Sequence, residues 1–141
     1  MLEWVLVMNN EEKLRKNMKC LDKWLSNHEK QKWIADYLKL YRIRQVGIYG
    51  YGILGKHLFS ELQGQGFPVS WVIDRSFSGD DICCKLVKPE DSDKLEDVDM
   101  AVVTSLANVE EMENVLLKFV TGKIVSIEEL IDSIYVWGNQ N

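Results

Sequence analysis

The sequence contains only two prolines, and its three cysteines form no Cys-x-x-Cys pair. That cysteine pattern supports neither a disulfide framework nor a zinc site. With nine glycines and 46% hydrophobic residues in 141, the chain cannot be a collagen-like repeat or a disordered segment. No apolar run approaches the ~20 residues that a membrane span needs. We therefore expect one soluble globular domain without a membrane-spanning segment.

The N-terminal segment MLEWVLVMNN lacks the basic start and the long apolar stretch of a signal peptide. Among the cysteines, Cys20 stands alone, while Cys83 and Cys84 are adjacent and follow two aspartates. Neighbouring carboxylates raise a thiol pKa, so these cysteines are expected to be inert. Together these features predict a cytoplasmic protein with reduced thiols.

The net charge of −5 is divided unevenly along the chain. Residues 1–43 carry nine Lys and Arg against six Asp and Glu, whereas residues 44–141 carry eight against sixteen. Nucleic-acid binding needs a concentrated basic face, which the larger part of the chain lacks. We expect no nucleic-acid partner, and we interpret the basic excess near the start as a solvated helix face.

Residues 1–43 are typical of a helical extension, because apolar residues recur at helical spacing. They are Leu14, Met18, Leu21 and Leu25, followed by Ile34, Tyr37, Leu38 and Tyr41. Asn10 before Glu11 is expected to cap the first helix, and Ser26-x-x-Glu29 to form a capping box where the second helix begins. The pattern therefore predicts two helices, with His28 solvated between them.

From residue 44 onward, short apolar segments alternate with amphipathic stretches. The expected strands cover 45–49, 69–73, 86–87 (the weakest), 100–104 and 123–125. Asn108-x-x-Glu111 and Ser126-x-x-Glu129 are expected to cap the last two helices, the first of which is ended by Gly122. This alternation specifies a parallel sheet with right-handed crossovers. The fold predicted for 44–141 is a doubly wound α/β domain of about five strands, preceded by the extension 1–43.

The sharpest local signal is a glycine-rich loop that directly follows the first strand and opens a helix. It consists of Gly50, Tyr51, Gly52, Ile53, Leu54 and Gly55. In this context GxGxxG is the dinucleotide-binding fingerprint of Rossmann-like folds. Gly50 permits the tight turn, Gly52 lets the backbone approach a phosphate, and Gly55 lets the helix pack on the sheet. The free N–H groups at the helix start would bind the anion. A tight turn that binds nothing is the alternative.

An acidic residue stands where such folds bind an adenosine ribose. Asp74 ends the second strand and could accept hydrogen bonds from both ribose hydroxyls. The neighbouring Arg75 could pair with a 2′-phosphate, but Asp74 would repel that phosphate, so NAD is preferred to NADP. Thr104 and Ser105 leave the fourth strand at its carboxyl end and are expected to line the other wall of the pocket.

The sequence contains no recognisable catalytic set: there is no Tyr-x-x-x-Lys pair, no Ser-His-Asp order and no metal-ligand cluster. His57 lies one turn beyond the glycine loop and is expected to be a surface or packed histidine. Ninety residues of α/β fold and two helices leave no second domain for a substrate. If the chain is an enzyme, another subunit must supply the substrate side.

Four stretches carry a family resemblance: VGIYGYGILGKHLFSEL, VSWVIDRS, DMAVVTS and KIVSIEELI. They are similar to small Rossmann domains of bacterial surface-polysaccharide synthesis. Such domains include the N-terminal domains of sugar O-acyltransferases and of nucleoside-diphosphate-sugar dehydratases, and glycosyltransferase-associated domains of Firmicutes. The resemblance covers about residues 44–132 and implies that Gly50, Gly52, Gly55 and Asp74 hold a nucleotide or nucleotide-sugar. The chain lacks the hexapeptide repeats and the dehydratase domain that carry catalysis in those proteins.

Three functions are therefore considered. The leading hypothesis is a module that binds NAD(H) or a nucleotide-sugar in a polysaccharide or sugar-nucleotide pathway, without complete catalytic machinery. The alternatives are a small NAD-dependent oxidoreductase completed by oligomerisation and a ligandless interaction domain. Five tryptophans, among them Trp4, Trp24, Trp33 and Trp137, favour an association surface for a second copy or a glycosyltransferase. The other explanation is that the extension packs on its own sheet and buries them.

Overall fold

The computed structural model describes residues 2–76, 84–105 and 108–139, with the side chains of 2–9 and 138–139 left out. Five strands form one sheet in the order β3-β2-β1-β4-β5, and all neighbouring strands are parallel. They are β1 (Val46–Tyr49), β2 (Val69–Ile73), β3 (Lys85–Val87), β4 (Met100–Val103) and β5 (Lys123–Ser126). This is the strand order of a Rossmann-like α/β fold, which confirms the predicted fold class.

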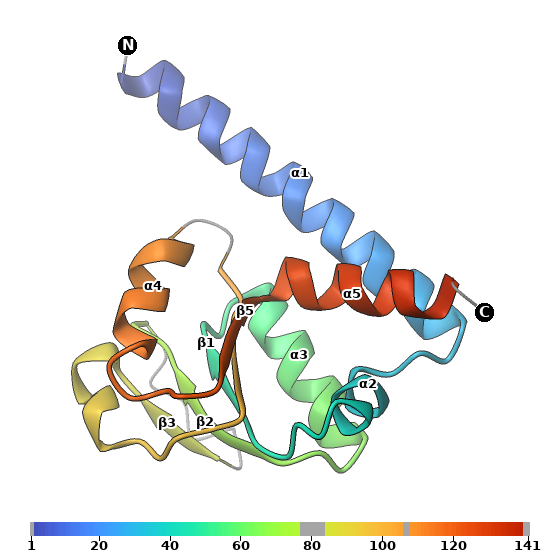
Figure 1. Ribbon diagram of the computed structural model, residues 1–141. Coiled ribbons are helices and arrows are strands. Elements are labelled where there is room, and N and C mark those ends of the chain that lie inside the picture. The colour runs from blue at the N-terminus through green and yellow to red at the C-terminus, as the bar shows by residue number, and fades with distance from the viewer. Residues whose placement is uncertain (1, 77–83, 106–107, 140–141) are drawn as a thin grey trace.

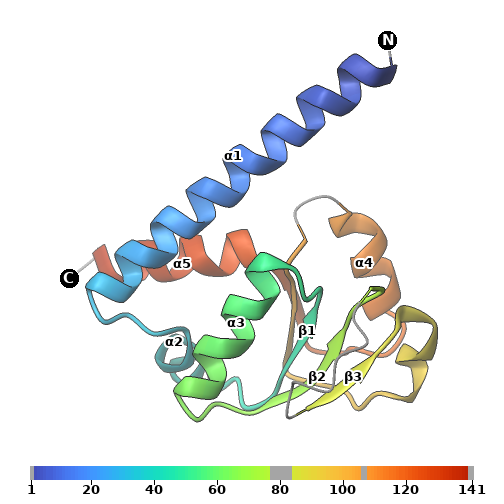
Figure 2. The same cartoon turned by 180° about the vertical axis from the view of Figure 1, so that it is seen from behind.

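Helices cover both faces of this sheet (Figures 1 and 2). One face is covered by α3 (Ile53–Gly64) and α5 (Ile127–Asn139), and α1 (Leu2–Glu29) and α2 (Ile34–Leu40) pack against these two helices. The other face is covered by α4 (Val109–Leu116) and by residues around the short 3₁₀ helix η1 (Pro89–Lys94). The chain therefore has three layers, with helices on either side of a buried sheet.

Successive residues of each central strand point to opposite faces of the sheet, so two apolar cores form. Ile48, Val72 and Val102 face the layer of α3 and α5. Trp71 and Val103 face α4, and the Trp71 indole donates a hydrogen bond to the Glu96 carbonyl oxygen at 2.9 Å. Burial on both faces explains why the central strands are continuous apolar runs instead of alternating ones.

The extension differs from its prediction in where its helices begin. Two helices are confirmed, but α1 starts at Leu2, so Asn10 lies inside the helix and is not its N-cap. No glycine or proline interrupts the preceding residues, and helix propagation continues through them. Ser26 lies inside α1, while α2 starts after Trp33 without a side-chain cap, so the capping-box prediction is wrong as well.

A single buried carboxylate of α3 fastens both helices of the extension to the sheet domain. The Glu61 side chain, 5% exposed, accepts hydrogen bonds from the Trp24 indole N–H at 2.7 Å and the Ile34 backbone N–H at 2.7 Å. It also contacts the His28 imidazole, so His28 is not simply solvated as predicted. Lys23 of α1 adds a 2.7 Å ion pair with Asp132 of α5.

The caps of the last two helices are confirmed only in part. Asn108 does occupy the N-cap position of α4, yet its side chain makes no capping hydrogen bond and α4 ends at Leu116, before Gly122. At α5 the prediction is confirmed, because the Glu129 backbone N–H donates to Ser126 Oγ at 3.1 Å. Among the described helices, none combines the length and apolar character needed to cross a membrane.

Candidate functional site

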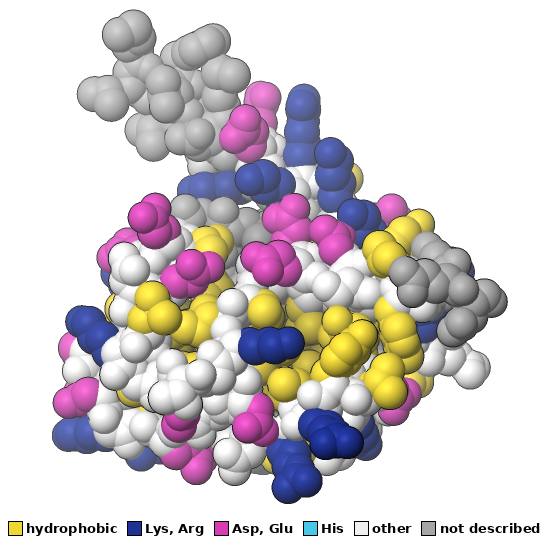
Figure 3. All heavy atoms as spheres, in the orientation of Figure 1, with side chains coloured by type: hydrophobic (Ala, Val, Ile, Leu, Met, Phe, Trp, Pro, Cys, Tyr) yellow, Lys and Arg dark blue, Asp and Glu magenta, His cyan; other side chains and the backbone are white. Residues whose placement is uncertain are grey.

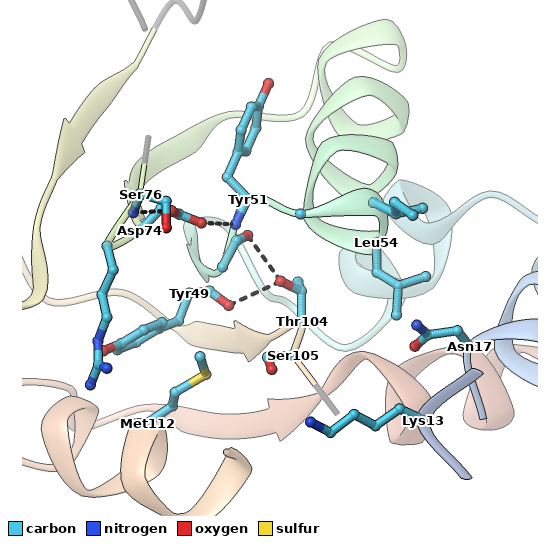
Figure 4. A pocket seen from close by; sticks show the side chains of 14 residues that line it. Lys13, Asn17, Tyr49, Tyr51, Leu54, Asp74, Ser76, Thr104, Ser105 and Met112 are labelled. Atoms are coloured by element: carbon cyan, nitrogen blue, oxygen red, sulfur yellow. Dashed lines mark hydrogen bonds between the residues drawn. The ribbon is translucent and has the colours of Figure 1, made fainter. Parts of the chain in front are cut away.

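A cavity of about 370 Å³ opens at the carboxyl ends of β1 and β4 (Figure 4). The chain order of the strands reverses between these two neighbours, which is where open α/β sheets bind ligands. The cavity lining includes nine of the ten residues predicted for the site, from the glycine loop and from the ends of β2 and β4. They are Gly50, Tyr51, Gly52, Ile53, Leu54, Asp74, Arg75, Thr104 and Ser105.

The tenth predicted residue, Gly55, lies behind the loop and shapes it. A Cβ atom on Gly55 would lie 2.0 Å from the Gly50 carbonyl oxygen, so only glycine lets α3 approach the loop this closely. Gly50 has a φ of +107°, a conformation that side chains rarely adopt, and its N–H donates to the Ile73 carbonyl at 2.7 Å. Both glycines therefore hold the loop in its tight turn.

Gly52 is the open position of the loop. It is the N-cap of α3, and a Cβ atom built there would meet no heavy atom within 4 Å. The first helical hydrogen bond runs from the Lys56 N–H to the Gly52 carbonyl at 2.9 Å. The amides of residues 53–55 precede that bond, and together with the helix dipole they offer a positive end to an anion.

Asp74 fastens the glycine loop from the neighbouring strand. One of its carboxylate oxygens accepts a hydrogen bond from the Tyr51 backbone N–H at 2.6 Å, and the other accepts one from the Ser76 N–H at 2.7 Å (Figure 4). The acid at the end of β2 thus lies at the cavity as predicted. It also has a structural role there that its sequence position did not indicate.

Thr104 performs a similar task at the end of β4. Its buried hydroxyl lies 3.0 Å from the Tyr49 carbonyl oxygen and 2.9 Å from the Gly50 carbonyl oxygen, and donates to them. A hydroxyl has one proton, and these two backbone carbonyls share it. Thr104 therefore has no second proton to donate to a ligand. Its neighbour Ser105 is half-buried at the cavity and presents its side chain from the same edge (Figure 4).

Arg75 and Tyr51 are placed by contacts outside the cavity. The Arg75 guanidinium donates to the Glu111 carboxylate of α4 at 3.0 Å, with both side chains largely exposed. The Tyr51 ring packs edge-on against Phe59 at 6.0 Å between centroids and turns away from Thr104 (Figure 4). Both residues are nevertheless part of the cavity lining.

The extension contributes two residues that sequence reasoning did not assign to the site. Lys13 and Asn17 of α1 line the cavity, and the Lys13 ammonium extends into it below Ser105 (Figure 4). In Figure 3, several basic side chains lie along α1 together with a few acidic ones, and acidic side chains gather over α4 and α5. Lys13 therefore brings a positive charge to the edge of an otherwise acidic domain.

Tyr49, Ser76 and Met112 complete the lining and were not predicted either. Tyr49 is 3% exposed, and burial raises the pKa of its phenol above the ordinary value, with a smaller opposing effect of Arg75. The phenol is therefore neutral near pH 7. The signal that could have found Tyr49 is its position as the last strand residue before the glycine loop.

The histidines and cysteines of the described part of the chain lie outside this cavity. His28 and His57 line a separate groove between α1 and α3. Cys20 is buried, and burial with the nearby Glu128 and Asp132 raises its pKa to about 11. Cys84 is half-buried, and Cys83 falls outside the described residues. Among the described residues, no group of three or more His, Cys, Asp or Glu could hold a metal ion.

Comparison of the chain with protein-family models, curated proteins and solved structures gave no match. The resemblance to polysaccharide-synthesis domains therefore stays a prediction. The described lining brings together the uncovered backbone at the start of α3, a strand-end carboxylate and one lysine around one cavity.

Proposed function

We propose that this cavity binds the phosphate-bearing part of NAD(H) or of a nucleotide-sugar. The observation that carries the proposal is the open backbone at Gly52, which is the N-cap of α3 and lies on a cavity of about 370 Å³. A volume of this size lies within the range of known ligand pockets. Without a side chain at Gly52, a phosphate can approach the backbone N–H groups at the start of α3 closely.

The phosphate groups would be held by local donors, since the surrounding domain is acidic. Backbone N–H groups at the start of α3 supply hydrogen bonds and the positive end of a helix dipole. Lys13 supplies the one ammonium group among the described residues of the lining. An ammonium group and backbone amides on either side of a diphosphate would offset the repulsion from the net charge of −8 between residues 44 and 141.

The ribose of an adenosine would lie near Asp74, at the end of β2. A carboxylate at this position favours unmodified ribose hydroxyls and repels a 2′-phosphate. The pairing of Arg75 with Glu111 supports the same preference, because Glu111 partly neutralises the cation that a 2′-phosphate would need. We therefore propose NAD(H) over NADP(H) among dinucleotides.

We further propose that the chain is a binding module without complete catalytic machinery. The described lining contains neither histidine nor cysteine, and Tyr49 is buried and neutral. General acid–base catalysis most often uses histidine, and the one carboxylate of the described lining, Asp74, already accepts hydrogen bonds from two backbone N–H groups. The part of this proposal that names a polysaccharide or sugar-nucleotide pathway rests on the sequence resemblance alone.

Calorimetric titration with NAD, NADP and a panel of UDP-sugars tests the proposal. We expect binding of NAD or of a UDP-sugar, and its loss in Gly52→Leu, whose side chain would fill the space above the loop. Gly64→Leu is the matched control, because a Cβ at Gly64, at the other end of the same helix, also meets nothing within 4 Å.

Both variants should unfold at nearly the same temperature, since neither position is crowded. No heat of binding with any of these ligands would overturn the proposal. Equal affinities of Gly52→Leu and Gly64→Leu would place the ligand elsewhere on the chain.

A further inference from the structure

The first helix carries an apolar face that the described part of the chain leaves largely exposed. Leu14, Met18 and Leu25 are 62%, 69% and 61% exposed, and Leu21 is half-buried. Leu21 packs partly against the domain core, but the fully buried residues of α1 are others, namely Cys20, Trp24 and Asn27. The periodicity seen in the sequence therefore marks a stripe beside the domain interface and not the interface itself.

The N-terminal part of α1 also extends away from the sheet domain. It projects past the sheet layers in both views (Figures 1 and 2), and residues 10–16 are all exposed. An isolated helix of fewer than ~12–15 residues is marginal in water, and most helix stability comes from packing. A helix of this length with an apolar stripe is the usual component of a helix pair.

The stripe leads into a groove between α1 and α3. This groove, of about 390 Å³, is lined by Leu21, Trp24, Leu25, His28, His57, Ser60 and Glu61. Its surface is mainly apolar, with the two imidazoles at its edge. If another helix ran along the stripe, one of its apolar side chains would therefore pack in this groove beside Leu25.

The spacing of the stripe is that of a coiled-coil seam. The intervals from Leu14 to Met18, Leu21 and Leu25 are four, three and four residues, which are successive d and a positions of a heptad. In this register Glu11 and His28 continue the seam at its two ends, and Arg15 and Asp22 flank it at e positions. Arg15 and Asp22 are both exposed.

We propose that α1 pairs with α1 of a second copy of this chain, and that the two helices are antiparallel. In that arrangement Leu14 of each copy lies opposite Leu25 of the other, and Met18 lies opposite Leu21. The N-terminal half of each α1 then runs along the groove between α1 and α3 of the other copy. Its Leu14 packs in that groove beside Leu25.

Charge decides between the antiparallel and the parallel pair. Antiparallel helices place Arg15 opposite Asp22 of the other copy twice, and they keep the two Glu11 side chains apart. Parallel helices would place Glu11 against Glu11, a like-charge pair at a core position, and would leave Arg15 facing an asparagine. The partner that fits this face is thus a second copy in antiparallel orientation, a conclusion that does not depend on the ligand proposed above.

Sedimentation velocity over a range of protein concentrations tests the pairing. We expect the wild-type chain to reach twice its 16.4 kDa mass, and Leu14→Glu/Met18→Glu to remain monomeric. Lys16→Gln/Lys19→Gln is the matched control: it changes the net charge by the same −2 at exposed positions outside the stripe and should still dimerise. Circular dichroism checks that both variants are folded.

A charge exchange tests the orientation. Arg15→Asp places two acids at each flank of an antiparallel pair and should weaken the dimer, whereas Arg15→Asp/Asp22→Arg should restore it. A wild-type chain that stays monomeric at all concentrations overturns the proposal. So does a dimer that survives Leu14→Glu/Met18→Glu, which would point to the apolar area near Tyr41, at the end of α2, and Val136 of α5 (Figure 3). Failure of the double exchange to restore the dimer overturns the antiparallel orientation.

Discussion

The Asp74 carboxylate accepts a hydrogen bond from the Tyr51 backbone N–H at 2.6 Å and so joins the end of β2 to the middle of the glycine loop. Because Tyr51 lies between Gly50 and Gly52, this contact fixes the backbone of the proposed phosphate site. One carboxylate thus takes part in the shape of the loop and in the proposed recognition of the ribose. The two roles can be separated by measuring stability and affinity on the same variants.

Asp74→Asn should loosen the glycine loop. The amide retains one acceptor oxygen for two backbone N–H donors, so we expect a loss of about 1–2 kcal/mol in the free energy of unfolding. Hydrogen exchange at the Tyr51 amide should become faster, as mass spectrometry of the loop peptide would show. Asp93→Asn removes the same charge from an exposed position of η1 and should change neither quantity. Unaltered exchange in Asp74→Asn would contradict the role assigned to this contact.

Gly55→Ala should destabilise the chain far more than the same change at Gly64. The added methyl group would lie 2.0 Å from the Gly50 carbonyl oxygen and 3.0 Å from Thr104 Oγ1, so the loop or the helix must shift. We expect a loss of about 2–3 kcal/mol, as for other overpacked sites. Gly64→Ala should be neutral or stabilising by up to ~1 kcal/mol, because the site is open and alanine favours a helix. Similar melting temperatures for the two variants would show that the close approach is unnecessary.

Lys13→Gln should weaken ligand binding without affecting the fold. The side chain extends into the cavity from an exposed segment of α1, so its ammonium would contact phosphate and little else. Loss of about 1 kcal/mol corresponds to a roughly fivefold increase in the dissociation constant measured by calorimetry. The remaining affinity should also be less sensitive to salt. Lys16→Gln, three residues away and outside the cavity, is expected to bind like the wild type.

Glu61→Ala should release the extension from the sheet domain. The buried Glu61 carboxylate contacts the Trp24 indole, the Ile34 backbone N–H and the His28 imidazole. Its removal leaves buried donors without an acceptor. We expect a loss of about 3 kcal/mol. Limited proteolysis should then cut between α1 and α2 before the sheet domain is degraded. If Glu61→Ala and the exposed-site control Glu12→Ala unfold alike, the anchoring role is wrong.

Stability should decrease above pH 9 because of Cys20. Burial and the neighbouring acids raise the pKa of this thiol from 9.0 to about 11, so it stays protonated in the folded chain while the unfolded chain already ionises. The folded state therefore loses stability as pH rises from about 9 to 11, by at most about 2–3 kcal/mol. Cys20→Ala lacks this contribution, and its stability should fall less over the same interval. Denaturant titrations at pH 8, 9, 10 and 11 give the comparison, and parallel curves would contradict it.

The sheet and the glycine loop could be predicted from the sequence because their signals are local. Continuous apolar runs such as 69–73 mark strands that are buried on both faces, and alternation with helices leaves parallel pairing as the solution. Glycines at fixed spacing after a strand likewise indicate the backbone conformation that one turn requires. For the same reason, nine of the ten predicted site residues line one cavity.

The extension could not be predicted to the same depth. Its periodicity located two helices, but the most regular apolar residues, such as Leu14 and Met18, proved to be the exposed ones. Its buried face consists instead of Cys20, Trp24 and Asn27, whose burial depends on α3 and α5. Residues 1–43 alone do not indicate which face of a helix will be covered by a distant part of the chain.

The sequence by itself determined the strands, their parallel pairing and the glycine turn, since each follows from backbone sterics and hydrophobic periodicity over a few residues. Only the tertiary structure decided that Lys13 reaches the cavity and that Glu61 fastens the extension. Both contacts join residues far apart in the chain, and they depend on how whole helices pack against one another. Such packing is fixed by the summed burial of many side chains, so it cannot be recognised in any single segment.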